Sequence, residues 1–419
     1  MKLDRRVLLG ALGVAAAGPA AAQETAPQQT DPAQLITARA RENRYRLDFD
    51  GAHFSGPAWD VLVEAGRAAR YFGIGEEHGI AENPKLAAQL LTALAPSGYA
   101  HACVETSPQM AAEMDRAARD GADGLRALFA DPGARVAFFG MREEAEWLAA
   151  VRVAAPRREQ AIWGLDYEIA GDRRIIARLA AQRKPAAAAA ALSRLEAASA
   201  AAWARYDETR DLQYAFTFAG DPGLVSAVRD AWPGAGDEAA WMLDTLEETL
   251  AINRLQAEGE YWRSNDRRAQ YNRANLRRYL ARADADARVL LKFGAYHMVR
   301  GLSHTQVFDV GNAVSEGAAA RGEQSFHLMV FPGAGAQIAQ LDAATWAYNA
   351  TPAGPYDDIG MTPLIDAAYA DAFTLIDLRP LRPLASGRRR KQLDTDLVRA
   401  VHGFDMLLVM SGSTASSNL

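Results

Sequence analysis

Two histidines and several carboxylates of this 419-residue chain follow short apolar segments. These residues are Glu76, Glu77, His78, Glu105, Asp166 and His297. Imidazole and carboxylate side chains transfer protons near neutral pH, and they also bind metal ions. If the fold brings them together, they predict general acid–base chemistry or a metal site, and hence an enzyme or a descendant of one.

The turn around His78 is the most specific of these signals. An apolar segment at 70–75 is followed at once by Glu76-Glu77-His78-Gly79. Glycine lets the backbone turn sharply out of a strand and lets a ligand come close. A carboxylate two residues from an imidazole can hydrogen-bond one ring nitrogen, which fixes the tautomer and raises the basicity of the other nitrogen. The pattern therefore favours a functional histidine over an incidental surface turn.

The segments that carry these residues are typical of parallel strands. They cover 70–75, 101–104, 161–165 and 289–293, and later strands are expected at 326–331, 373–378 and 405–410. Helical spacing of apolar residues between the first three predicts an α/β fold, with a mainly parallel sheet flanked by helices. Because the carboxyl ends of parallel strands meet at one edge, where ligands bind, we expect the polar residues to converge there.

A segment without any strand pattern separates the third and fourth strands. We expect a first part of the α/β domain at 57–170, a helical insertion at 171–284, and a second part at 285–411. The insertion's helices are predicted at 172–182, 186–206, 222–231, 237–259 and 263–283. In the last helix Arg268, Asn272 and Asn275 share one face, which could hold an anionic or carbonyl oxygen or could simply be solvated. The segment 333–355 is interpreted as a long loop.

The first residues resemble an export signal. Arg5-Arg6 precedes an apolar stretch from Val7 to Ala17, and Ala20-Ala-Ala22 fits a cleavage site. The paired arginines favour the twin-arginine route over an ordinary secretory signal. The sequence thus predicts a signal peptide at 1–22, cleavage near Ala22, a periplasmic protein, a flexible lead-in at 23–56 and a polar tail at 412–419.

Composition excludes several classes of protein. The single cysteine, Cys103, lies in an apolar strand and allows no internal disulfide. A net charge of -6 without a basic stripe argues against a nucleic-acid partner, and the apolar N-terminal stretch is too short to span a membrane. No serine-hydrolase elbow or phosphate loop is present. The other histidines, His53, His101, His304, His327 and His402, are interpreted as structural or surface residues. The sequence gives no indication of oligomeric state.

Together, the motifs resemble the erythromycin esterase-like family, which is grouped with the ChaN-like haem-binding proteins. The resemblance runs from about residue 57 to 411. It rests on the turn at 75–82, on Val104-Glu105, on Gly164-Leu165-Asp166, on the helix 268–276, on the stretch from Phe293 to His297 and on Phe404-Asp405.

The resemblance implies an ester or lactone hydrolase that acts on a small molecule and needs no cofactor. In that family the turn histidine is taken as the base that activates water. The resemblance implies His78 as the base, with Glu76, Glu105 and His297 orienting it or polarising the substrate. In the resulting hydrolase hypothesis, Glu105 and Asp166 position the histidines or protonate the leaving alcohol. We also expect substrate contacts from Glu82, Arg268, Asn275 and Arg300.

Two departures from the family pattern leave alternatives open. The turn is one residue shorter, so either Glu76 or Glu77 could face the site. One histidine of the family's motif before His297 is missing, which argues against a macrolide as the substrate. The alternatives are a ChaN-like haem- or metal-binding protein, a metal-assisted hydrolase that uses the same residues, and a degenerate member with a structural role. A divalent metal or haem is therefore not excluded by the sequence.

Overall fold

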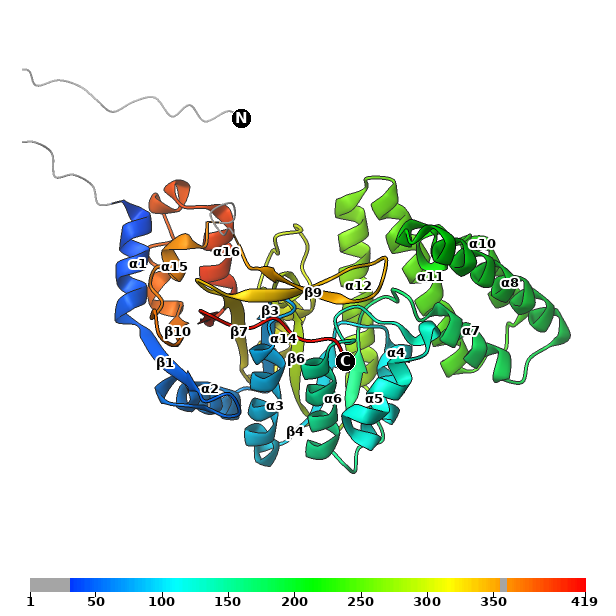
Figure 1. The fold of residues 1–419 in the computed structure, drawn as a ribbon, viewed down its shortest axis with the longest axis horizontal. Coiled ribbons are helices and arrows are strands. Elements are labelled where there is room, and N and C mark those ends of the chain that lie inside the picture. Colours follow the sequence, from blue (N-terminus) through cyan, green and yellow to red (C-terminus); the bar gives the residue numbers. More distant parts are fainter. Residues whose placement is uncertain (1–30, 355–359) are drawn as a thin grey trace, which may run out of the picture. The chain divides into compact units, whose positions relative to one another are not determined.

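A nine-stranded, mostly parallel sheet forms the centre of the protein, and helices cover both of its faces (Figure 1). The computed structural model describes residues 31–354 and 360–419, so the predicted signal peptide lies outside the described residues. The strand order is β2-β1-β10-β11-β7-β3-β6-β4-β5. The strands are β1 (Arg44–Phe49), β2 (Phe54–Ser55), β3 (Tyr71–Glu76), β4 (Tyr99–Val104), β5 (Ile162–Gly164), β6 (Arg288–Gly294), β7 (Ser325–Pro332), β10 (Phe373–Asp377) and β11 (Met406–Met410). This α/β architecture confirms the predicted fold class and strand positions.

The five strands that matter for the site, β7, β3, β6, β4 and β5, are all parallel to their neighbours. Their side chains alternate between two hydrophobic cores, because successive residues of a strand point to opposite faces. One core contains Phe72 and Ile74 and packs under α2 (Pro57–Ala68), α3 (Glu82–Leu94), α4 (Pro108–Ala117), α5 (Gly121–Phe129) and α6 (Arg142–Ala154). The other contains Leu291 and Phe293 and packs under α1 (Pro32–Glu42), α12 (Tyr261–Leu280), α14 (Val310–Ala319) and α16 (Thr395–Gly403).

A run of helices separates β5 from β6, at the positions expected for the insertion. They are α7 (Asp172–Ala181), α8 (Ala186–Thr209), the short α9 (Phe216–Ala219), α10 (Pro222–Ala231), α11 (Asp237–Ala257) and α12. Helices α7 to α11 enclose a core of their own, which includes Leu195, Trp203 and Leu246. Helices α8, α10 and α11 lie at the far end from α1 (Figure 1). No helix within the described part of the chain has the length and apolar character needed to cross a membrane.

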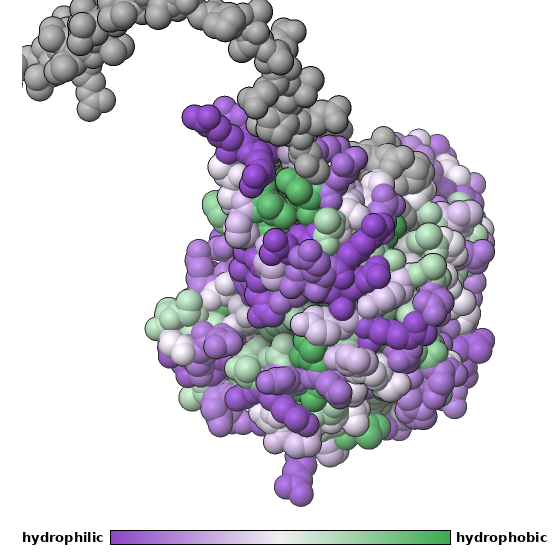
Figure 2. Space-filling model, turned by 90° about the vertical axis from the view of Figure 1, so that its left-hand side faces the viewer, coloured by the Kyte–Doolittle hydropathy of each residue, from purple (hydrophilic) through white to green (hydrophobic). Residues whose placement is uncertain are grey.

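The prediction of a flexible lead-in at 23–56 is wrong for residues 32–55, which form α1, β1 and β2. Strand β1 pairs with β10 and with the short edge strand β2, and only Leu47 of its six residues is buried, so its polar sequence gives little sign of a strand. The sheet ends in the two-residue β2 and the three-residue β5, and such short edge strands offer little backbone for pairing with other chains. The side that carries α1 and α2 is mainly hydrophilic, with small hydrophobic patches (Figure 2).

Two other segments are more ordered than the sequence suggested. The expected loop at 333–355 contains a hairpin of β8 (Gln337–Leu341) and β9 (Tyr348–Pro352), although residue 355 lies outside the described residues. The polar tail forms bridges between Ala415 and Ile80 and between Asn418 and Met141. The hairpin and the tail both pack beside the turn that follows β3.

Candidate active site

A cavity of about 420 Å³ lies where β3, β4 and β6 end. Glu76 is the last residue of β3, Glu105 follows β4, and His297 lies in the short helix α13 (Ala295–Met298) directly after β6. All three line the cavity together with His78 and Arg268. The convergence expected at the carboxyl ends of parallel strands is therefore present.

His78 is held between two carboxylates. Its Nδ1 lies 2.8 Å from Oε1 of Glu76, and its Nε2 lies 3.4 Å from Oε2 of Glu105. The ring stacks on Phe138 with centroids 3.8 Å apart. Glu77 also lines the cavity, but Glu76 is the residue that contacts the imidazole. Both acidic residues of the turn thus line the cavity, and Glu76 is the one bonded to the ring.

Gly79 makes the tight turn after His78 possible. Its φ is 89°, a conformation that side chains disfavour, and a Cβ at this position would come within 2.3 Å of the Ala339 carbonyl oxygen of β8. The amide of Ala339 in turn donates to the Gly79 carbonyl. The hairpin therefore fixes the backbone on one side of the His78 turn.

A buried lysine supports Glu76 from behind. Lys292 of β6 donates to Glu76 Oε1 at 2.7 Å and to Glu144 Oε1 of α6 at 2.6 Å, and all three side chains are almost fully buried. Burial raises the pKa of Glu144 to about 7, and the positive charge of Lys292 limits the rise. Neither Lys292 nor Glu144 was predicted as a site residue. The position of Lys292 inside the apolar segment 289–293 was the one feature of the sequence that pointed to a buried charge.

His297 is held in a similar way to His78. Its Nδ1 lies 2.7 Å from Oδ2 of Asp309, and its Nε2 lies 3.3 Å from Oε1 of Glu105. Asp309 caps α14 by accepting the Val310 amide, so its position is fixed by the start of that helix. Asp309 was also missed from sequence, since nothing in its surroundings distinguishes it from an ordinary helix cap.

Arg268 brings α12 to the site. Its Nη2 donates to Glu105 Oε1 at 2.8 Å, and its Nε donates to Asp166 Oδ1 at 2.9 Å. Glu105 also accepts the Gly294 amide at 2.7 Å, so one carboxylate contacts Arg268, Gly294 and both histidines. Asp166 does not line the cavity, and its place in the site is to hold Arg268.

These contacts set the charge of the two imidazoles. Burial alone lowers the pKa of His78, but its hydrogen bonds to Glu105 and Glu76 outweigh burial and raise the pKa to about 10. Burial and Arg268 lower the pKa of His297, while Glu105 and Asp309 raise it to about 10. The pKa of Glu105 lies well below its usual value, because burial is outweighed by His297 and His78. Both histidines are therefore in the protonated, positively charged form at neutral pH in the resting site.

Three predicted substrate contacts are absent from the cavity lining. Glu82 accepts hydrogen bonds from the Thr414 amide and hydroxyl, which fastens the C-terminal segment. Asn275 accepts from the Trp241 indole and donates to the Leu165 carbonyl. Arg300 pairs with Asp405 and with the Ser325 carbonyl. Their polar atoms are used inside the fold, so the structure gives them a stabilising place and not a substrate contact.

The cavity wall contains residues that sequence reasoning set aside. His304, which was interpreted as structural or surface, lines the cavity and stacks on Tyr296 with centroids 4.7 Å apart. Its Nδ1 lies 3.0 Å from Asp396 of α16. The rest of the wall is largely apolar and is formed by Phe138, Val299, Met329, Phe331, Met361, Ala400 and Phe404. A small molecule with an apolar part fits such a lining.

The histidines and carboxylates of the cavity are better suited to proton transfer than to binding a metal ion. Among the residues that the structure describes, no group of three His, Cys, Asp or Glu side chains is arranged to hold a metal. Arg268 and Lys292 already neutralise Glu105 and Glu76, and both ring nitrogens of each histidine face a carboxylate. A further cation would have to displace these charges.

We therefore expect the purified protein to contain no stoichiometric metal or haem. Elemental analysis and an absorption spectrum of protein prepared without chelator measure this directly. A near-stoichiometric metal or a haem band in the wild type, lost in His78→Ala, would contradict the expectation and would turn the interpretation towards a metalloprotein.

Comparisons with known proteins give a likeness of structure only. The chain matches no protein-family model and no curated protein sequence. A mutant of the erythromycin esterase EreC in its open conformation superposes with a TM-score of 0.60 at 16% identity, over 90% of this chain and 98% of that one. A succinoglycan biosynthesis protein superposes with a TM-score of 0.59 at 13% identity, over 94% of this chain and 100% of that one. A Bacillus cereus protein superposes with a TM-score of 0.56 at 14% identity, over 92% of this chain and 99% of that one. A structure of ChaN of Campylobacter jejuni with cofacial haem is matched at 0.32. The chain has the fold of the erythromycin esterases, as its motifs predicted.

Proposed function

We propose that this protein is an exported hydrolase that cleaves a carboxylic ester or lactone of a small molecule. The observation that carries the proposal is the arrangement of His78 between Glu76 and Glu105, with His297 and Arg268 beside it at one cavity. Proton transfer and stabilisation of a developing oxyanion are the two requirements of ester hydrolysis, and this set offers groups for both. The fold of an erythromycin esterase supports the same class of reaction.

In the proposed mechanism, the neutral form of His78 is the base. Its Nε2 takes a proton from water, and the hydroxide attacks the ester carbonyl carbon. The oxyanion that forms is stabilised by the imidazolium of His297 and the guanidinium of Arg268. The C–O bond then breaks, and the proton on His78 passes to the leaving alcohol oxygen. Glu76 holds the Nδ1 proton throughout, which keeps Nε2 available.

The two histidines have different charged partners, and their roles in the proposed mechanism also differ. Glu76 is shared between His78 and Lys292, so part of its negative charge is already balanced. His297 is paired with Asp309 and Glu105, which favour its charged form. The pKa of each histidine is about 10, so these contacts do not separate the two roles. We assign the role of base to His78 because its turn resembles the catalytic turn of the erythromycin esterase-like family, and the role of electrophile to His297.

The proposal predicts an alkaline pH profile. Because the pKa of His78 is about 10, the neutral imidazole is scarce at pH 6 and increases about tenfold per pH unit towards pH 9. We expect kcat/KM for nitrophenyl esters and small lactones to rise with that slope in steady-state assays. A profile that is already flat from pH 6 would contradict His78 as the base.

Folding has to be followed in the same experiment. The raised pKa of His78 contributes stability that is fully present below the unfolded pKa, near 6.5, and is lost as pH rises through about 10. Circular dichroism at each pH separates this loss from the titration of the base. If folded wild type cleaves no ester or lactone of the panel at any pH, the proposed function is rejected.

A further inference from the structure

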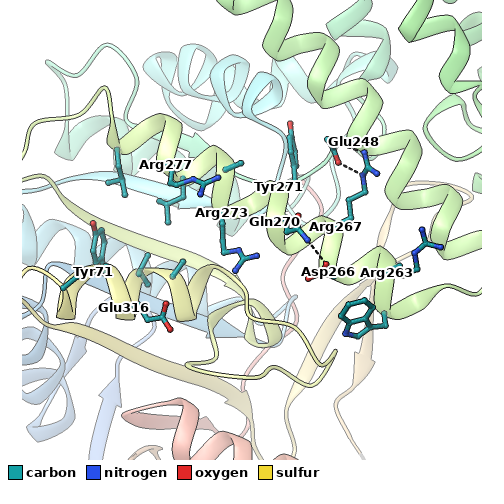
Figure 3. A pocket seen from close by; sticks show the side chains of 18 of the residues that line it. Tyr71, Glu248, Arg263, Asp266, Arg267, Gln270, Tyr271, Arg273, Arg277 and Glu316 are labelled. Carbon is teal, nitrogen blue, oxygen red and sulfur yellow. Dashed lines mark hydrogen bonds and ion pairs between the residues drawn. The ribbon is translucent and has the colours of Figure 1, made fainter.

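A second cavity, of about 1240 Å³, borders the helix that supplies Arg268 (Figure 3). It is lined by the face of α12 that carries Arg263, Arg267, Gln270 and Arg277. Since successive residues of a helix are 100° apart, this face points away from the face of Arg268, Asn272 and Asn275. The cavity, called here the arginine groove, is therefore separate from the candidate active site. Its other wall is α14.

The arginines of the groove are unequally paired. Arg267 forms two hydrogen bonds with Glu248, at 2.6 and 3.0 Å, and Gln270 is bonded to Asp266 (Figure 3). Arg273 uses only its Nε, on a carbonyl of its own helix at 3.2 Å. Within the part of the chain that the structure describes, the side chains of Arg263 and Arg277 make neither a hydrogen bond nor an ion pair. The groove thus presents guanidinium donors without protein acceptors.

The opposite wall leaves room for a ligand in front of these donors. Ala313, Gly317 and Ala320 follow one another along the lining at helical spacing, so this stripe of the wall carries only small side chains, with Val314 and Glu316 beside it. A Cβ placed on Gly317 would meet no atom within 4 Å. Trp262 is 57% exposed at the lining, and its indole N–H is held by the Gln306 carbonyl at 3.1 Å. The groove therefore combines open space, cationic donors and a fixed aromatic ring.

We propose that the arginine groove binds an acidic oligosaccharide, with carboxylates on the arginines and a sugar ring against Trp262. Arginine is suited to planar, bidentate recognition of carboxylates. Arg263 and Arg277 are 14 residues apart on one helix, a distance of about 21 Å, so the donors match a chain and not a single small ion. The flat, apolar face of an exposed indole offers stacking area. This binding site is independent of the proposed hydrolysis.

The overall charge of the protein argues for such a ligand over nucleic acid. The chain has a net charge of -6, and Glu248, Asp266 and Glu316 also line the groove. A nucleic-acid site normally needs a broad excess of positive charge, because affinity comes from many phosphate contacts. A few arginines between acidic residues suit a short acidic chain that makes only a few carboxylate contacts.

Binding of a labelled galacturonate hexamer, measured by fluorescence anisotropy, tests the proposal. We expect the wild type to bind it, more weakly as salt rises, and not to bind a neutral glucose hexamer. The double variant R273Q/R277Q is expected to lose at least about tenfold in affinity, equivalent to about 1.4 kcal/mol. Gly317→Glu adds a carboxylate in the open space and is expected to have a similar effect. Arg194→Gln, an exposed arginine of α8 outside the groove, is the control.

Three results would overturn the proposal. They are the absence of hexamer binding by folded wild type at low salt, an equal loss of affinity in Arg194→Gln, and tighter binding of an oligodeoxythymidylate than of the hexamer. The last result would assign the groove to single-stranded nucleic acid. Ester hydrolysis, assayed on the same samples, is expected to be unchanged in all the groove variants, so failure of this proposal is distinct from failure of the proposed function.

Discussion

Replacing His78 with alanine is expected to lower kcat/KM for an ester or lactone substrate by about 10²–10⁴-fold, the range that a positioned general base supplies. The other two imidazoles of the cavity have partners of their own, since His297 is held by Asp309 and Glu105 and His304 lies against Asp396. The fold should survive the change, because Glu76 keeps its ion pair with Lys292 and Glu105 keeps Arg268. Steady-state kinetics with a thermal melt of each sample measure both properties.

The matched control for this variant is His53→Ala. The side chain of His53 is 78% exposed and has only a long contact with Asp50, so its removal should leave activity and stability unchanged. If His78→Ala is folded and retains wild-type kcat/KM, the base lies elsewhere and the mechanism is wrong. If both variants lose activity equally, the loss does not come from the site.

Replacing Lys292 with methionine is expected to reduce the free energy of unfolding by about 3–5 kcal/mol. The change leaves Glu76 and Glu144 close together in the core without their shared cation, and Glu144 Oε2 already has no partner in the described structure. The full negative charge of Glu76 then acts on His78, so the pKa of His78 should rise further and the pH profile should move to higher pH. Urea unfolding and the pH dependence of kcat/KM measure the two effects.

Two further variants give this test its controls. Lys391→Met removes an exposed lysine and should change neither measurement. Lys292→Met combined with Glu144→Leu removes one of the stranded carboxylates, so it should recover part of the lost stability, since replacing both partners of a buried pair costs less than removing one. Unchanged stability in Lys292→Met alone would show that the buried network does not hold Glu76.

Much of the site could be predicted because parallel strands impose its geometry. His78, Glu105, Asp166 and His297 each follow an apolar segment, and the common direction of those strands is enough to bring them to one edge. Arg268 was found by helical spacing and by family resemblance, although spacing alone left it equally compatible with a solvated face. What the sequence could not show is which face of α12 points to the sheet, because that depends on how the helices pack.

The residues that were missed or misplaced have physical reasons in common. Lys292 and Asp309 act through partners distant in sequence, and a single chain gives no sign of such pairs. Strand β1 was not expected because its place beside the two-residue edge strand leaves five of its six residues at least partly exposed. Glu82, Asn275 and Arg300 lie near the correct motifs, but their side chains satisfy buried backbone and side-chain groups, which only the packed structure reveals.

The strand order has a consequence for how this protein must be made. Strand β3 lies between β6 and β7, and β4 also pairs with β6, so both early strands wait for partners that come after all the helices from α7 to α12. Such distant pairing slows folding and leaves apolar strands exposed during synthesis. A nascent chain that stops before β6 therefore carries the His78 turn without the strands that shape it, and is a natural client for chaperones.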